Sequence, residues 1–224
     1  MSVITVERKV LEKNDLIAQK NRKAFKENNT FTINLVSSPG SGKTSIVERT
    51  IHHIKENIKF AVIEGDVQTD LDAQRVDAYG IPVVQIVTQG GCHLEAGLVR
   101  DAYNRLEDKN IDALLIENVG NLVCPAGYDL GEDFKVVIVS TTEGDDKPLK
   151  YPAMFRNASV LIINKVDLIP HVNCSLETLR KNAHSINSSL TIFETSCTTD
   201  EGIPDWCDWL ESQIKNVHLN EASS

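Results

Sequence analysis

Residues 31–44 read FTINLVSSPGSGKT: a short run of β-forming residues, a glycine-containing turn, and the start of a helix. The glycines allow backbone N–H groups to turn inward, and the N-terminus of the helix adds a positive partial charge. Lys43 can reach the β- and γ-phosphates of a nucleotide, and Thr44 can place its hydroxyl on Mg²⁺. The stretch therefore predicts a phosphate-binding loop, with Ser37 where the pattern G-x-x-x-x-G-K-S/T has its first glycine.

Further runs rich in valine, isoleucine and leucine follow, separated by stretches with helical spacing. The predicted strands cover residues 31–38, 60–66, 81–87, 112–118, 135–141, 159–164 and 190–196. Near-continuous apolar runs are typical of strands covered on both faces, and their alternation with helices indicates crossovers between parallel strands. We therefore predict an α/β chain with a three-layer P-loop NTPase fold, in which helices flank a mostly parallel central sheet.

Two later motifs indicate which base the site binds. Asp167, in the NKVD sequence that closes the sixth predicted strand, can accept paired hydrogen bonds from guanine N1–H and N2–H₂, which adenine does not offer. TSCTTDEG at 195–202 offers backbone N–H groups for guanine O6. We therefore expect a site for GTP and GDP. Its predicted residues are Pro39, Gly40, Ser41, Gly42, Lys43, Thr44, Ser45, Asn164, Lys165, Asp167, Ser196, Cys197 and Thr198.

Carboxylates at two other strand ends are candidates for magnesium binding and catalysis. Glu117 stands in LLIENVG, where a GTPase usually has Asp-x-x-Gly, and Asp66, Asp70 and Asp72 follow the second strand. Asp70 and Asp72 are also favourable in the first turn of a helix without any catalytic role. The expected magnesium ligands are Thr44, Asp66, Asp72 and Glu117, and the expected catalytic residues are Lys43, Asp66, Asp72 and Glu117. No glutamine stands where Ras-like enzymes position water, so we expect a slow, Mg²⁺-dependent GTPase.

Composition and length limit the other possibilities. The formal net charge of −9 does not favour binding to nucleic acid. No stretch approaches the roughly 18 apolar residues of a membrane span, and the first residues lack the apolar core of a secretory signal. We expect a cytoplasmic protein with an amphipathic helical lead-in at 1–30, a P-loop GTPase domain at 31–217 and a flexible tail at 218–224.

Cysteine and histidine lie at two of the same strand ends. The chain has five cysteines, an odd count that does not suggest a disulfide framework. Cys92-His93 follows the third predicted strand and Cys124 the fourth, so they should converge near the phosphate-binding loop. Two thiolates and an imidazole suit Zn²⁺ or Ni²⁺, and a two-fold dimer could complete the coordination shell. The alternative is that both cysteines are small buried residues and that His93 merely begins a helix.

A wider set of motifs resembles one GTPase family. The sequences LVSSPGSGKT, IEGDVQTDLDAQR, GGCHLEA, IENVGNLVCPAGYDLGE, STTEGDDKPLKYP and INKVDL together look like the HypB family. That family assists nickel insertion into nickel–iron hydrogenase and belongs to the SIMIBI class with the urease accessory GTPase UreG. The resemblance implies GTP-dependent homodimerisation, a metal site at Cys92, His93 and Cys124, a HypA-type nickel chaperone as partner, and the hydrogenase large-subunit precursor as target.

Two features leave alternatives open. Many members of the family carry an N-terminal Cys-x-x-Cys-Gly-Cys nickel site and often a histidine-rich store, whereas this chain begins MSVITVERK, so we expect metal handling at the G-domain site. A GTPase that serves urease or delivers zinc would share the motifs derived from the residues alone. Lys147 and Lys150 could contact nucleotide or a partner protomer, or could belong to a solvated turn.

Overall fold

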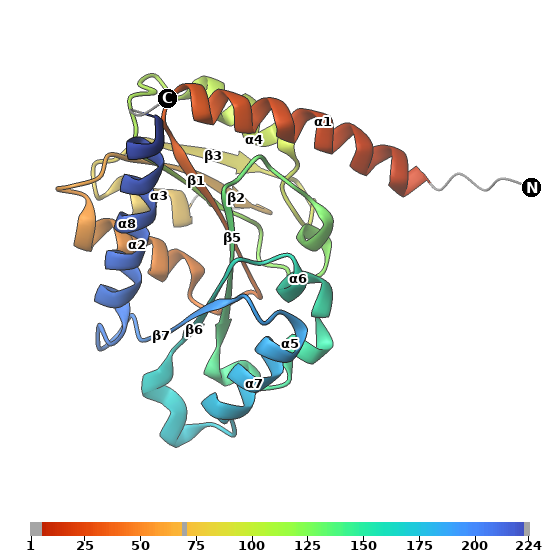
Figure 1. Ribbon diagram of the computed structural model, residues 1–224, viewed down its shortest axis with the longest axis vertical. Coiled ribbons are helices and arrows are strands. Elements are labelled where there is room, and N and C mark those ends of the chain that lie inside the picture. The colour runs from red at the N-terminus through yellow and green to blue at the C-terminus, as the bar shows by residue number, and fades with distance from the viewer. Residues whose placement is uncertain (1–5, 69–70, 222–224) are drawn as a thin grey trace, which may run out of the picture.

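The computed structural model describes residues 6–68 and 71–221, and within them seven strands form one sheet (Figure 1). The strands are β1 (Phe31–Ser37), β2 (Phe60–Asp66), β3 (Val83–Val87), β4 (Ala113–Glu117), β5 (Phe134–Ser140), β6 (Val160–Asn164) and β7 (Thr191–Thr195). Their order is β3-β2-β4-β1-β5-β6-β7, and each neighbouring pair is parallel. The predicted α/β fold is therefore confirmed.

Helices connect the strands. They are α1 (Val6–Glu27), α2 (Lys43–Ile54), α3 (Leu71–Asp77), α4 (Ala96–Arg105), α5 (Lys147–Lys150), α6 (Pro152–Arg156), α7 (Leu176–Ile186) and α8 (Ile203–Glu221). Short 3₁₀ turns η1 (Cys124–Gly127), η2 (Thr141–Glu143) and η3 (Val166–His171) follow β4, β5 and β6. Helix α8 continues past residue 217, where the sequence predicts a flexible tail, because no glycine or proline interrupts residues 205–221. Residues 222–224 lie outside the described part.

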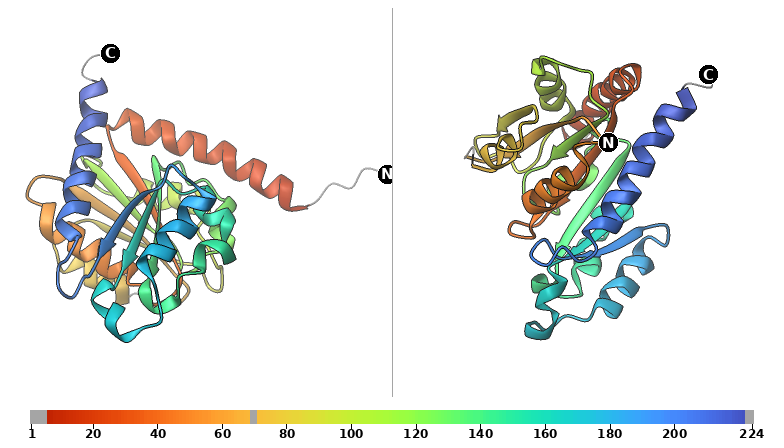
Figure 2. Two further views of the ribbon diagram at one scale, coloured as in Figure 1. Left: turned by 60° about the horizontal axis from the view of Figure 1, so that its bottom comes forward. Right: turned by 90° about the vertical axis from the view of Figure 1, so that its left-hand side faces the viewer.

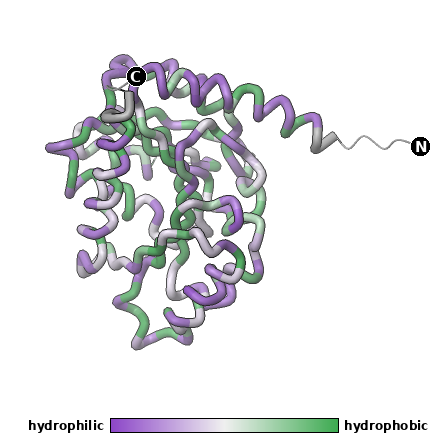
Figure 3. Tube along the Cα trace, viewed as in Figure 1, coloured by the Kyte–Doolittle hydropathy of each residue, from purple (hydrophilic) through white to green (hydrophobic). Residues whose placement is uncertain are grey.

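The period of two along each strand divides the core between the faces of the sheet. Ile33 and Leu35 of β1 pack with α2 and α8 on one face, whereas Val36 packs on the other. Helices α2, α3 and α8 cover the first face, and α1, α4, α6 and α7 cover the second (Figure 2). Figure 3 shows the resulting apolar interior beneath polar helix surfaces. Across the described residues, no helix is both long and apolar enough to cross a membrane.

The fold brings the loops that follow β1, β2, β3 and β4 to one edge of the sheet. Because all these strands are parallel, their carboxyl ends share that edge. β1 lies between β4 and β5, so the loop between β1 and α2 has the β4 loop on one side and the β5 loop on the other. This edge collects the predicted nucleotide and metal residues.

Candidate functional site

The phosphate-binding loop is shaped by two glycines and one asparagine. Gly40 and Gly42 have φ of 77° and 95°, in the left-handed region that favours glycine. A Cβ on Gly42 would lie 2.4 Å from Asn164 Nδ2, and that amide donates to the Ser41 carbonyl at 3.0 Å. Ser37 is the last residue of β1, with its hydroxyl donating to the Ser38 carbonyl, so serine at this position does not disturb the loop.

Lys43 and Thr44 converge on one buried carboxylate. The Lys43 ammonium lies 2.7 Å from Glu117 Oε1, and the Thr44 hydroxyl donates to the same oxygen at 2.6 Å. Glu117 is fully buried, and its second oxygen, Oε2, has no hydrogen-bond partner. The end of β4 is thus joined to the first turn of α2 through the two side chains predicted to serve phosphate and magnesium.

An acidic cluster adjoins this contact. Glu64, Asp66 and Asp72 each place a carboxylate oxygen within 4.8 Å of the others. Glu64 pairs with Glu117 in register across β2 and β4, and burial together with the nearby Glu117 charge raises the pKa of Glu64 to about 8. An all-oxygen set with an unpartnered buried atom, Glu64 Oε2, fits a hard cation such as Mg²⁺. Asp70 lies outside the described residues.

A cavity of about 530 Å³ opens between these elements. It is lined by Ser37, Ser38, Pro39, Gly40, Gly42, Lys43, Thr44, Ser45, Glu64, Gly65, Asp66, Val67, Asp72, Arg75, Val119, Gly120 and Lys165. A Cβ on Gly120 would lie 3.2 Å from Pro39 Cα, so the loop after β4 closely approaches the phosphate-binding loop. The predicted magnesium ligands Thr44, Asp66 and Asp72 therefore line one cavity with Lys43. Glu117 does not line it but contacts Lys43 and Thr44.

The predicted base-binding residues are only partly at this cavity. Lys165 lines it and donates to the Gly40 carbonyl at 2.7 Å, with φ of 63°. Asn164 connects the phosphate-binding loop to Thr195 and to the Cys197 thiol. Asp167, in η3, is half-buried and lies outside the cavity lining. Thr198 and Cys197 line a neighbouring hollow beside α2, and the Ser196 hydroxyl accepts from the Thr198 N–H.

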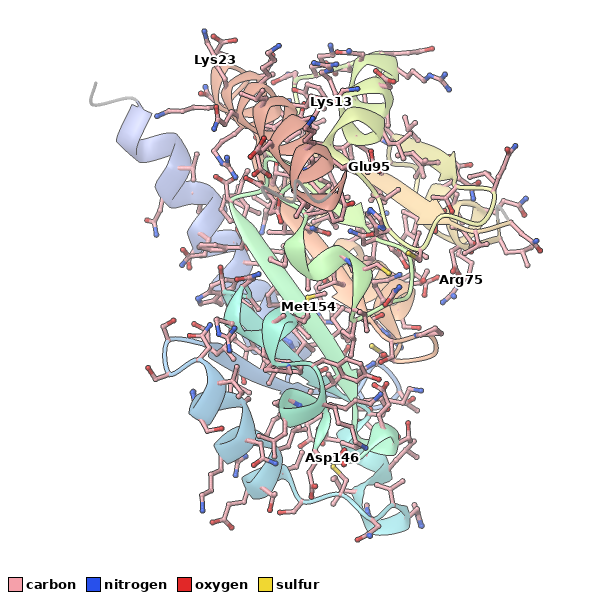
Figure 4. The ribbon with its side chains drawn as sticks, turned by 90° about the vertical axis from the view of Figure 1, so that its right-hand side faces the viewer. Lys13, Lys23, Arg75, Glu95, Asp146 and Met154 are labelled. Carbon is pink, nitrogen blue, oxygen red and sulfur yellow. The ribbon has the colours of Figure 1, made fainter. Side chains whose placement is uncertain are left out.

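The two lysines that the sequence left open differ in position. Lys147 Nζ lies 3.3 Å from Glu143 and donates to the Ser38 hydroxyl at 3.4 Å, so it contacts the phosphate-binding loop. Lys150 forms an exposed ion pair with Asp146 at 2.7 Å, and the Asp146 side chain is seen at the surface in Figure 4. Lys147 therefore belongs to the surroundings of the nucleotide cavity, whereas Lys150, the last residue of α5, is exposed to solvent.

Cys92, His93 and Cys124 come together, although 32 residues separate the two cysteines in sequence. Each offers one ligand atom, and the three atoms lie within 4.8 Å of one another. Cys92 Sγ is 3.5 Å from His93 Nδ1. Cys92 is exposed and Cys124 half-buried, so neither is the fully buried residue of the alternative interpretation. Sulfur and imidazole donors at this spacing fit a soft divalent cation.

The surroundings fix the ligands' orientation and protonation. Burial lowers the pKa of His93, which favours the neutral imidazole that binds metals. A hydrogen bond with Cys124 raises the pKa of the Cys92 thiol, so metal binding at Cys92 has to displace a proton. The His93 ring packs on Tyr128 with centroids 4.0 Å apart. Asn121 donates to the Cys92 carbonyl at 3.3 Å and accepts from the Cys124 N–H at 3.4 Å, so one side chain joins both cysteine loops.

A buried polar chain runs from the nucleotide side to the metal loops. Asn118, the residue after Glu117, accepts from the Leu94 N–H at 3.0 Å and donates to Asn34 at 3.1 Å. The Asn34 amide donates to Glu132 at 3.1 Å, and Lys135, 3.7 Å from Glu132, donates to the carbonyls of Tyr128 and Pro125. Adjacent residues at the end of β4 thus contact the nucleotide loop and the metal loops, respectively.

Several of these residues were not predicted from the sequence. Glu64 carried a signal, because it lies in the same strand end as Asp66, and Arg75 lies in the same motif and donates to Asp72 at 3.1 Å. Asn118 and Asn121 are polar residues of the loop after β4, and no sequence motif indicates which groups they contact.

Comparisons with known proteins show the family and the fold of this chain. Residues 31–194 match the family model for the CobW/HypB/UreG nucleotide-binding domain. The hydrogenase maturation factor HypB of Azotobacter vinelandii is 49% identical over 211 residues, which cover 94% of this chain and 70% of the relative. HypB of Archaeoglobus fulgidus has a TM-score of 0.85 at 40% identity, covering 91% and 99% of the two chains. HypB of Helicobacter pylori, solved in complex with nickel, has a TM-score of 0.87 at 36% identity, covering 91% and 96%.

Proposed function

Since the chain belongs to the CobW/HypB/UreG family of P-loop GTPases and, within it, to the HypB hydrogenase maturation factors, we propose that it is a cytoplasmic metallochaperone. In this role it couples slow GTP hydrolysis to nickel insertion into the large-subunit precursor of nickel–iron hydrogenase. A HypA-type chaperone and a second copy of the chain are its proposed partners. The nickel complex of the Helicobacter pylori relative supports nickel over zinc as the cargo. The names of the relatives favour hydrogenase over urease as the target.

The observation that carries this proposal is the position of the Cys92, His93 and Cys124 cluster. Its three ligand atoms lie within 4.8 Å of one another on the loops after β3 and β4. The same β4 end supplies Glu117, which contacts Lys43 and Thr44. A soft-metal site and a phosphate-binding loop that share a strand end are what a nucleotide-controlled metal carrier requires.

The proposed roles in nucleotide binding and hydrolysis fall on residues of the cavity and on Asp167 outside its lining. We propose that the backbone N–H groups of Gly40 to Thr44 and the Lys43 ammonium hold the phosphates of GTP, and that Asp167 accepts from the guanine N1–H and N2–H₂. Thr44, Asp66, Asp72 and Glu117 would hold Mg²⁺, with Glu64 as a further oxygen donor beside them. Bound there, Mg²⁺ would neutralise charge on the phosphates. Asp66 or Asp72 would orient the attacking water.

Exposed apolar residues near the metal loops support a homodimer. Val123, next to Cys124, is 63% exposed, and Val87, at the end of β3, is 48% exposed. Burial of such residues stabilises association by about 25 cal/mol per Å² of apolar surface. A two-fold axis close to Cys124 would place the two metal sites face to face and let protomers share ligands. Loops that respond to the γ-phosphate would then change both the dimer and the metal site.

Metal analysis with absorption spectra of the wild type and Cys124→Ala tests the metal site. The wild type should bind Ni²⁺ with a thiolate-to-nickel charge-transfer band, and loss of one of the three ligands should remove most of that band and weaken binding by about 10-fold or more. Cys174→Ala is the matched control, because Cys174 is also a half-buried free thiol but lies outside the cluster. An unchanged band in Cys124→Ala would exclude Cys124 as a ligand.

A further inference from the structure

Helix α1 contacts both loops that carry the metal ligands. It lies alongside α4 in Figures 1 and 2 and packs on the second face of the sheet. In Figure 4, Lys13 and Lys23 mark its exposed surface and Glu95, at the start of α4, lies beside it. Its buried stripe is unusual, because Asn14 and Asn21, at 4% and 1% exposure, alternate with the apolar Ala18 and Phe25.

Asn14 links the two loops with both ends of its amide. Its Oδ1 accepts from the Ala96 N–H at 2.9 Å, and its Nδ2 donates to the Asp129 carbonyl at 2.7 Å. Ala96 is the first residue of α4 and comes three positions after His93, and Asp129 comes five after Cys124. The Ala96 N–H is one of the first N–H groups of α4, which have no acceptor within the helix, and Asn14 of α1 supplies that acceptor.

Asn21, two helical turns further on, links the same two segments. Its Nδ2 donates to the Ala96 carbonyl at 2.8 Å and to the Leu130 carbonyl at 2.9 Å. Gly131, with φ of 96°, lets the backbone approach α1 so closely that a Cβ there would lie 2.7 Å from Asn21 Cβ. The Arg22–Asp129 ion pair, at 2.8 Å, adds an exposed contact at the same place.

Helix docking alone does not explain these asparagines. A buried amide costs free energy unless its polar atoms are paired, and an apolar residue would pack on α4 without that requirement. Here Asn14 pairs both ends of its amide, and Asn21 pairs its Nδ2, with backbone groups of the same two segments, whereas Asn21 Oδ1 has no hydrogen-bond partner. These bonds join the two segments to α1 and so fix their separation, which nonspecific apolar packing would not do. Asn118 and Lys135 hold the same loops from the side of the sheet.

We propose that α1 is a positioning element of the metal site: Asn14 and Asn21 set the separation of the Cys92–His93 loop and the Cys124 turn so that the three ligands reach one soft divalent cation. This inference rests on the proposed metal-binding function. It gives the N-terminal helix a role in cargo binding that is separate from the nucleotide cavity, since neither asparagine lines that cavity.

The test compares Asn14→Ala/Asn21→Ala with the wild type in the full-length chain. Co²⁺ is the probe, because thiolate ligation gives a charge-transfer band whose intensity and position report the coordination. Substitution of residues that support metal ligands typically weakens metal affinity by about 10–100-fold, and we expect that range with a weaker or shifted band. Affinity for a fluorescent GDP should be unchanged. Gln19→Ala is the matched control, because Gln19 is an exposed amide on the same helix.

A second measurement, the rate of disulfide formation, needs no metal. Circular dichroism of the same variants shows whether α1 is still folded. Oxidation with diamide, followed by peptide mapping, gives the rate at which Cys92 and Cys124 form a disulfide, which depends on the spacing of the two thiols. We expect a slower rate in the double variant than in Gln19→Ala, with the helical circular dichroism retained. The positioning role would be overturned if the double variant matched the wild type in its Co²⁺ affinity, its charge-transfer band and its rate of disulfide formation. Failure of the wild type to bind Co²⁺ would overturn the metal site, while the disulfide rates would still decide whether α1 sets the spacing.

Discussion

The nucleotide site and the metal site lie at the same edge of the sheet but are built differently. In the nucleotide site Thr44 and Glu117 are buried, Lys43 is half-buried, and the three are already engaged, because Lys43 and Thr44 both contact Glu117. In the metal site Cys92 is exposed, and its ligand atoms converge mainly on one another. The nucleotide site is supported by Glu117 at the end of a sheet strand, whereas the metal site is formed by two loops.

This difference suggests a division of roles. The buried Glu117 carboxylate holds Lys43 and Thr44 in a fixed geometry, which would suit charge stabilisation if these residues contact the phosphates as proposed. Exposed thiols on two loops suit a cargo that must enter and leave. The two sites meet at the end of β4, where Glu117 contacts the first and Asn118 the second, and at the end of β2, where the Asp66 carbonyl accepts from the Thr88 N–H of the loop after β3. Substitutions in one site away from these contacts should therefore affect that site more than the other.

Lys43→Ala should have the largest effect and should leave the metal site intact. Removal of the ammonium takes away a charge that stabilises the phosphates, so GTP hydrolysis should fall by about 10²–10³-fold. Single-turnover phosphate release measures it, and a Co²⁺ titration of the same variant should match the wild type. Lys20→Ala, an exposed lysine on α1, is the control. Hydrolysis at the wild-type rate would show that Lys43 does not serve the phosphates.

Asn118→Ala should affect both sites moderately. The Leu94 N–H loses its acceptor and Asn34 loses a donor, so Co²⁺ affinity should fall by about tenfold. The difference in Co²⁺ affinity between the GDP form and the GTP-analogue form should also shrink. Asn182→Ala removes a comparable amide that donates to Asp145 away from both sites. A wild-type difference between the two nucleotide forms would show that Asn118 does not connect them.

The strands and the cysteine cluster could be predicted because each depends on local pattern and on one topological rule. Apolar runs bounded by turns define β1 to β7, and parallel strands bring their carboxyl-end loops to one edge. Cys92 and Cys124 follow β3 and β4, which are consecutive in sequence, so the rule places both at that edge; their convergence also needs the two loops to reach across β2, which lies between these strands.

The supporting residues could not be predicted, because their roles depend on contacts between distant segments. Asn14 and Asn21 look like solvent-facing residues of an amphipathic helix, and only the docking of α1 shows that they are buried. Glu64 lies within β2, and its position opposite Glu117, 53 positions later in the sequence, depends on the register of β2 and β4. Buried polar pairing is specific to the fold rather than to the local sequence.

The smallest expected effect concerns the pH dependence of stability at the buried carboxylates. Glu64 has a pKa of about 8 in the folded chain, raised from 4.5 by burial and by Glu117. Between pH 4.5 and 8 the folded chain therefore binds more protons at this carboxyl than the unfolded chain, so its contribution to stability falls as pH rises and changes no further above about 8. Glu64→Gln has no proton to lose, and it keeps a similar shape.

The nucleotide-free proteins should therefore differ in the slope of stability against pH. Relative to Glu64→Gln, the wild type should lose on the order of 1 kcal/mol per pH unit within that window. Urea unfolding at several pH values measures the free energies, and subtraction of the two curves removes the contribution of groups that both proteins share. Parallel curves would mean that the Glu64 carboxyl is already ionised beside Glu117, with its charge compensated by Lys43. The Lys43 charge lowers the pKa of Glu64, so the same experiment in the Lys43→Ala background should extend the loss of stability to higher pH, with the slope unchanged within the window.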